Sequence, residues 1–221
     1  MRRKILILAL ATGLAWTPVL QAQQVVDRIV ARIEDDILAQ SEVRELGRFQ
    51  QLVNSAGAGE RKELPGEDEL IGLLIDQWMV DAEATAAQFP RPTKEQVQKE
   101  TERLSAQFGS VDAYRARRKE LGLTAESVER HVERQIYLAR YLEYKFRPVA
   151  QVESAQVEKY YREELVAELR KGGQDAPALE TVEEQIRELL TQREISARAA
   201  KWLEETRKRL KIEIMGKKNT P

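Results

Sequence analysis

The chain has 221 residues, of which 33% are charged and only 6% aromatic, and its formal net charge is −1. Because it contains no cysteine and one histidine, disulfides and thiolate chemistry are excluded and a transition-metal site is disfavoured. A near-neutral balance of both signs argues against nucleic acid as a partner. This composition favours amphipathic helices with solvated faces over a β-sandwich.

The first 22 residues are arranged like a secretory signal peptide. Three basic residues precede the apolar run 5–16, and small Ala22 precedes Gln23. A run of 12 residues is shorter than the roughly 18–20 that a membrane span needs, so we expect cleavage between Ala22 and Gln23 and no stable span afterwards. Cleavage leaves 199 residues with a net charge of −4, enough for one or two modest domains.

The mature chain is expected to begin with a small β element. Residues 25–33 are predicted to form a strand, because Ile29, Ala31 and Ile33 alternate with Arg28, Val30 and Arg32. The acidic run 34–36 is read as a solvated turn, because its spacing does not match a calcium-binding loop, and residues 37–38 pair back as a short second strand. Ser41 is predicted to cap a helix that ends near Asn54.

Helices are predicted for most of the remaining chain. Thr93 with Gln96 forms a capping box, and Ser110 and Thr124 are further N-cap residues. The predicted helices cover residues 67–88, 94–108, 111–121, 124–146, 154–171 and 180–209. Residues 210–214 alternate strictly and predict a terminal strand.

A two-stranded ribbon is marginal alone, so the N-terminal and C-terminal strands are expected to pair. The predicted fold class is mostly α, with a small antiparallel β element that joins the two ends of the chain. Helices are expected to cover one face of this element.

No catalytic constellation stands out. The only histidine, His131, lies four residues after Ser127, but no nucleophile elbow presents that serine, and we expect a partly exposed histidine on a helix face. Glycoside hydrolysis by two carboxylic acids needs a defined pair of carboxylates, and the sequence singles out no such pair among those at 76, 81 and 83. The sequence therefore predicts no catalytic residue, no metal site and no cofactor.

Several segments resemble SurA-type periplasmic chaperones and related parvulin-type foldases. Residues 25–43 match the opening strand, turn and helix start of that family, and 70–86 match the next helix. Residues 152–161, ending in Tyr-Tyr, resemble the helix that leads into the family's isomerase domain. Residues 186–215 resemble the closing helix and strand. Together these segments cover nearly the whole mature chain.

The chain departs from that family where the parvulin isomerase domain belongs. Only 32 residues, 149–180, stand at that place, whereas a compact domain typically needs roughly 100 residues. No histidine follows His131 and there is no cysteine, so the residues of a parvulin site have no counterpart. The resemblance implies a signal peptide (1–22), a chaperone domain (23–148), a helix and loop (149–180), a closing helix and strand (181–215) and a tail (216–221).

The resemblance implies an ATP-independent periplasmic chaperone, not an enzyme, whose partners are unfolded or partly folded exported polypeptides of the envelope. Two alternatives stay open: a degenerate or truncated peptidyl-prolyl isomerase, and an envelope assembly factor with one dedicated partner. Aromatic side chains, where exposed, are the candidate contacts for clients. These candidates are Trp78, Phe89, Phe108, Tyr114 and Tyr137.

Overall fold

A computed structural model describes residues 27–56 and 63–215. The predicted signal peptide, its cleavage site and the tail lie outside these residues. In chain order the elements are β1 (Ile29–Ile33), β2 (Asp36–Ala39), α1 (Gln40–Asn54), α2 (Glu67–Ala86), α3 (Lys94–Ala106), α4 (Val111–Glu120), α5 (Ala125–Phe146), the 3-10 turn η1 (Arg147–Val149), α6 (Ser154–Tyr160), the π-helical turn η2 (Tyr161–Leu165), α7 (Val166–Lys171), α8 (Leu179–Arg207) and β3 (Ile212–Ile214).

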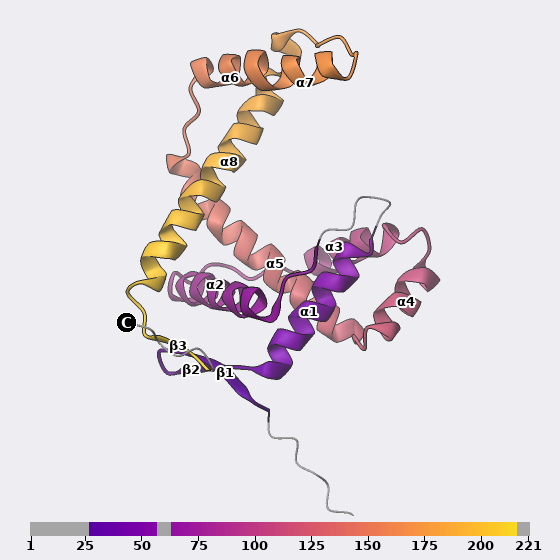
Figure 1. Ribbon diagram of the computed structural model, residues 1–221, viewed down its shortest axis with the longest axis vertical. Helices are drawn as coiled ribbons and strands as arrows, with labels where there is room; N and C mark the ends of the chain where they lie inside the picture. The colour runs from indigo at the N-terminus through magenta and orange to yellow at the C-terminus, as the bar shows by residue number, and fades with distance from the viewer. Residues whose placement is uncertain (1–26, 57–62, 216–221) are drawn as a thin grey trace, which may run out of the picture.

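The described part of the chain forms one small sheet whose strand order is β2-β1-β3. β1 pairs with β2 through a two-residue turn and with β3 in antiparallel register, so that Ala31 lies opposite Ile214. The predicted mostly helical fold with a small antiparallel element is therefore confirmed, as is the pairing of the N-terminal and C-terminal strands. The sheet lies at the lower end of the molecule in Figure 1.

β1 departs from the strict alternation expected from its sequence. The register shifts between Ile29 and Ala31, and Val30 is buried together with Ala31 and Ile33. A bulge of this kind changes the face to which a side chain points. As a result, β1 turns more of its apolar side chains toward the helices than a regular strand would.

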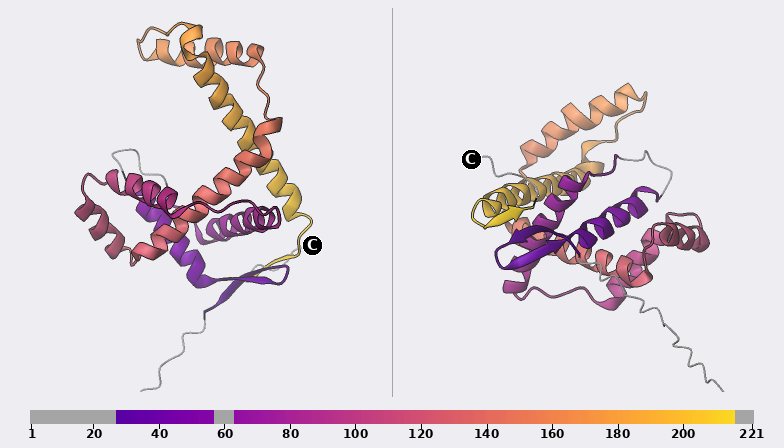
Figure 2. Two further views of the ribbon diagram at one scale, coloured as in Figure 1. Left: turned by 180° about the vertical axis from the view of Figure 1, so that it is seen from behind. Right: turned by 60° about the horizontal axis from the view of Figure 1, so that its bottom comes forward.

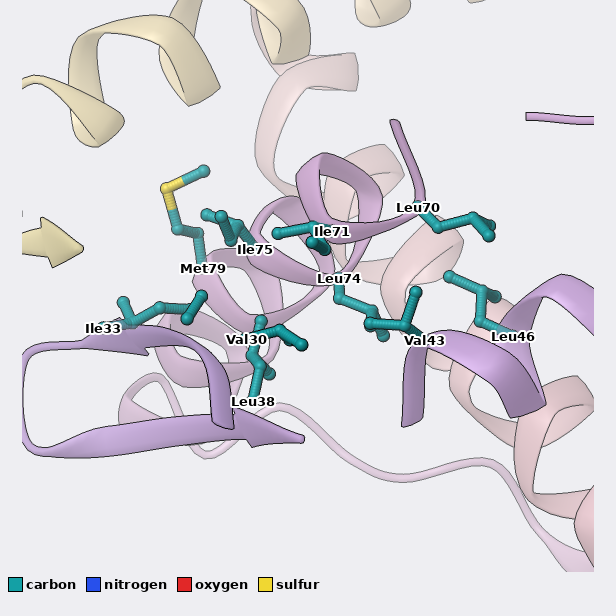
Figure 3. Close-up of a cluster of buried hydrophobic side chains, with 11 residues drawn as sticks. Val30, Ile33, Leu38, Val43, Leu46, Leu70, Ile71, Leu74, Ile75 and Met79 are labelled. Carbon is teal, nitrogen blue, oxygen red and sulfur yellow. The ribbon is translucent and has the colours of Figure 1, made fainter. Parts of the chain in front are cut away.

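The first core lies between the hairpin of β1 and β2 and the helices α1 and α2. Figure 3 shows Val30, Ile33 and Leu38 pointing at the apolar face of α2. Met79 and Ile75 of α2 are at most 2% exposed in this core, and Val43 of α1 belongs to the same cluster. Side chains from the last strand, Ile212 and Ile214, pack against the same cluster.

The second core lies where α1 meets α3, α4 and α5. Phe49 and Leu52 on α1 are buried together with Val128 and Val132 on α5. The three predicted N-caps of this region are confirmed: the side-chain oxygens of Thr93, Ser110 and Thr124 accept hydrogen bonds from backbone N–H groups at the starts of α3, α4 and α5.

We call the sheet with α1 to α5 the lobe. α5 and α8 cross at its edge, and α8 continues away from the sheet to the far end of the molecule (Figures 1 and 2). There α6, η2 and α7 form one nearly continuous helix that packs against α8. We call this projecting part, together with the N-terminal half of α8, the arm. Val157 of α6 and Ile186 of α8 are buried within the arm.

The prediction that Ser41 caps α1 is wrong. Ala39 is the N-cap residue, and its backbone N–H donates to Glu42 at 2.8 Å. The Ser41 hydroxyl instead donates to the Asp27 carboxylate, and this hydrogen bond lowers the pKa of Asp27. The Ser41 side chain therefore binds a residue 14 positions earlier in the chain and does not cap the helix.

Candidate functional site

The five predicted client contacts lie in three separate places. Trp78 is half-buried on α2, where its indole N–H donates to Asp36 of β2 at 2.9 Å. Phe108 and Tyr114 pack together in the second core, with Tyr114 only 6% exposed. Phe89 and Tyr137 lie together at the junction of α2 and α5. The structure therefore does not bring the five side chains into one surface, and it buries Tyr114 and Tyr137.

The junction of α2 and α5 holds a larger aromatic cluster than the sequence prediction included. The Phe89 ring lies 5.9 Å from Tyr137, 5.5 Å from Tyr141 and 5.3 Å from Tyr144, measured between ring centroids. Tyr137 and Tyr141 are buried, Phe89 is half-buried, and the Tyr144 side chain is 65% exposed. We call these four rings the aromatic platform.

The spacing of three tyrosines on α5 explains one side of the platform. Residues 137, 141 and 144 follow one another at intervals of four and three, so their side chains share a face of the helix. In the sequence, such spacing is typical of side chains that pack against a neighbouring helix. Packing accounts for Tyr137 and Tyr141, whereas Tyr144 stays 65% exposed although its ring contacts Phe89.

The end of α2 places Phe89 over that face. Gln88 adopts a left-handed conformation with φ of 54°, which turns the chain back. The backbone N–H of Phe89 then donates to the carbonyl of Ala84 at 2.9 Å. For a residue other than glycine, the left-handed conformation costs of order 1–3 kcal/mol, so the surrounding contacts must hold this turn in place. Pro90 follows directly and prevents the helix from continuing.

Cationic side chains surround the platform. The guanidinium carbon of Arg91 lies 3.9 Å from the centre of the Tyr137 ring, and that of Arg140 lies 5.8 Å from the Phe89 ring. Such contacts contribute roughly 0.5–1 kcal/mol at exposed sites. Rings flanked by guanidinium groups offer both apolar contact and hydrogen-bond donors to a bound chain.

Next to the platform, a polar network joins α2, α5 and α8. Glu83 accepts hydrogen bonds from the Lys145 ammonium and from the Tyr141 hydroxyl, the latter at 3.3 Å. Burial, with the Glu83 carboxylate beside it, raises the pKa of Tyr141 to about 12. Lys145 also lies 4.9 Å from the Trp202 ring of α8. This network fixes the platform at the place where α8 crosses α5.

A second ionic contact joins α5 to the base of the arm. Arg147 donates to both carboxylate oxygens of Glu188, at 3.0 and 2.6 Å, and also to Glu143 one turn earlier in the helix. The hydrogen bonds from Arg147 lower the pKa of Glu188 to about 2. A bidentate contact favours one distance and one orientation, so it restrains α8 relative to the end of α5.

The residues that a hydrolase would need are not brought together. Ser127 completes the capping box at the start of α5, where its hydroxyl accepts from the Thr124 backbone N–H at 3.1 Å. His131 points elsewhere and stacks on Phe49, with ring centroids 4.7 Å apart. The His131 side chain is 13% exposed, so the histidine lies partly exposed on a helix face, as expected. The packing of α1 on α5, which local spacing does not show, covers most of the ring.

No protein-family model matches the chain, and no curated protein matches it significantly. A search of the helices within residues 27–56 and 63–215 finds none that is both long and apolar enough to cross a membrane.

Proposed function

We propose that this chain is an ATP-independent chaperone that binds unfolded or partly folded exported polypeptides in the periplasm, without isomerase activity. The observation that carries the proposal is the aromatic platform: Tyr144 is 65% exposed, and its ring lies against those of Phe89 and Tyr141 near the C-terminal end of α5. The resemblance of the chain's segments to SurA-type chaperones points in the same direction.

The physical argument starts from what an unfolded segment offers. It carries apolar and aromatic side chains that a folded protein would bury, and its peptide groups are free to accept hydrogen bonds. A partly exposed ring cluster flanked by Arg91 and Arg140 complements both features. Many weak contacts of this kind provide low affinity and broad choice, as promiscuous binders require.

The arm adds length to this surface. α6 and α7 lie at the far end of α8 from the sheet, and α6 packs against α8 (Figure 1). Half-buried apolar residues lie along the arm, among them Leu165, Leu169 and Val182. Leu189 of α8 is 40% exposed. An extended segment held at the platform has further apolar surface within the same molecule.

The proposal predicts that Tyr144→Ser weakens protection of unfolded proteins. An outer-membrane protein diluted from urea is followed by light scattering in the presence of increasing amounts of the chain. An exposed aromatic contact is worth about 0.5–1.5 kcal/mol, so half-maximal protection is expected to require up to about tenfold more of the variant. Because Tyr144 is largely exposed, the variant's stability is expected to stay within about 0.5 kcal/mol of the original.

Val111→Ser is the matched control, because Val111 is 53% exposed on α4 in another part of the lobe. It is expected to protect as well as the original chain. Equal protection by the Tyr144 variant would remove the platform from the mechanism. Failure to protect any unrelated unfolded protein, together with co-purification of one partner, would favour the dedicated assembly factor, and turnover of a proline-containing peptide would favour the isomerase.

A further inference from the structure

His131, the only histidine of the chain, lies in the contact between α5 and α1. Its ring stacks on Phe49, with 18° between the ring planes, and Phe49 is itself 1% exposed in the second core. A cavity of about 270 Å³ opens beside the imidazole. Its other lining residues are Ser41, Glu42, Glu45, Leu74, Arg130 and Arg134.

Charges of both signs face the imidazole. From α1, the Glu45 carboxylate lies 3.3 Å from Nε2 of His131, and Glu42 lines the same cavity. From α5 itself come Arg130 and Arg134, which lie one residue before and three residues after the histidine. The Glu45 oxygen near His131 also accepts a hydrogen bond from Arg130 at 3.1 Å. Leu74, which α2 contributes, brings no charge.

We propose that this contact is a proton-sensitive joint: adding a proton to His131 loosens the packing of α1 on α5. The neutral ring stacks on a buried phenyl ring at little electrostatic cost. A cationic ring at the same place loses most of its hydration and faces two guanidinium groups, while the nearest carboxylate is already shared with one of them.

The direction of the effect follows from where the proton binds. Burial lowers the pKa of His131 below its usual 6.5, Arg134 and Arg130 lower it further, and Glu45 opposes them. The unfolded chain therefore binds the proton more readily than the folded one in the pH range just below 6.5. The stability that neutral His131 provides is complete above that range and is lost as the pH falls through it.

The absence of any other histidine makes the test direct, because the full chain has one imidazole Cε1–H resonance in a proton NMR titration. We expect a midpoint below 6.5 in the folded chain and near 6.5 in urea. Arg134→Gln is expected to raise the folded midpoint and Glu45→Gln to lower it. A folded midpoint at or above 6.5 would overturn the proposal, as would two substitutions that shift it in the same direction.

A second measurement links the proton to stability. The unfolding temperature of the full chain and of His131→Gln is compared at pH 7.5 and pH 5.5. Each unit of pKa difference corresponds to a fall of roughly 3–5 °C in a protein of this size, and only the chain with His131 should show that extra fall. An equal fall in both chains would contradict a proton-sensitive joint, and if the variant does not fold, the NMR titration decides alone.

Discussion

Replacing Phe49 by alanine is expected to lower the free energy of unfolding by about 3–5 kcal/mol. Phe49 is 1% exposed and lies among Leu52, Val128 and Val132, so it joins α1 to α5 in the second core. The substitution removes the ring and leaves a cavity between α1 and α5 that the remaining side chains fill only in part. It also removes the surface on which His131 stacks.

Urea unfolding followed by circular dichroism measures this loss. Val111→Ala serves as the control, because its side chain is 53% exposed and the change should stay within about 0.5 kcal/mol. A loss below 1 kcal/mol for the Phe49 variant would mean that α1 and α5 do not depend on each other for packing, and the assignment of a second core would be wrong.

Removal of the last strand is expected to have an effect of similar size. A chain that ends at Arg209 lacks Leu210, Ile212 and Ile214, all of which pack partly buried against the first core. Since a fully buried aliphatic side chain contributes about 1.5–3 kcal/mol, three partly buried ones contribute about 3–5 kcal/mol together. The truncation also leaves β1 and β2 as a two-stranded ribbon, which is marginal in water.

The same urea measurement tests this expectation, and hydrogen exchange adds its location. Amides of β1 and α2 should lose protection, while those of α3 and α4, which lie in the second core, should change less. Glu213→Thr is the matched control, because it keeps the strand and changes an exposed side chain. An unfolding free energy that stays the same after truncation would show that the C-terminal strand does not hold the lobe together.

Local signals explain which parts of the fold were predictable from sequence. Thr93, Ser110 and Thr124 cap helices through hydrogen bonds to residues three positions later, so the sequence alone contains both partners. Ser41 has the same residue type as Ser110, yet it bonds to Asp27, which lies outside the helix and is brought near by the hairpin. A cap is predictable only when no distant group competes for its side chain.

The buried face of α8 shows a second limit. The apolar stripe in its sequence includes Leu189, Ala197 and Ala200, all of which are exposed in the structure. The side that packs on α5 instead includes Ile195 and Ala199. Apolar spacing identifies a helix, but a helix of this length has partners at different points along it, and the position of α5 decides which side is covered.

The candidate site was predictable in part for a similar reason. Phe89 and Tyr137 were proposed as client contacts from residue type, and they do share one cluster. The spacing of Tyr137, Tyr141 and Tyr144 indicates that they share a helix face, but it does not indicate which of them is exposed. Tyr144 is 65% exposed although its ring contacts Phe89, and that exposure is a property of the folded chain.

The central claim is that the aromatic platform contacts unfolded polypeptides, and site-specific photo-cross-linking tests it most directly. A photoreactive aromatic amino acid is placed at position 144 and, in a matched variant, at position 111, which is also exposed but lies on α4. Both are irradiated with an unfolded outer-membrane protein diluted from urea. We predict cross-links to the client from position 144 and few or none from position 111. Equal yields from the two positions, or a higher yield from position 111, would contradict the proposed function of the platform.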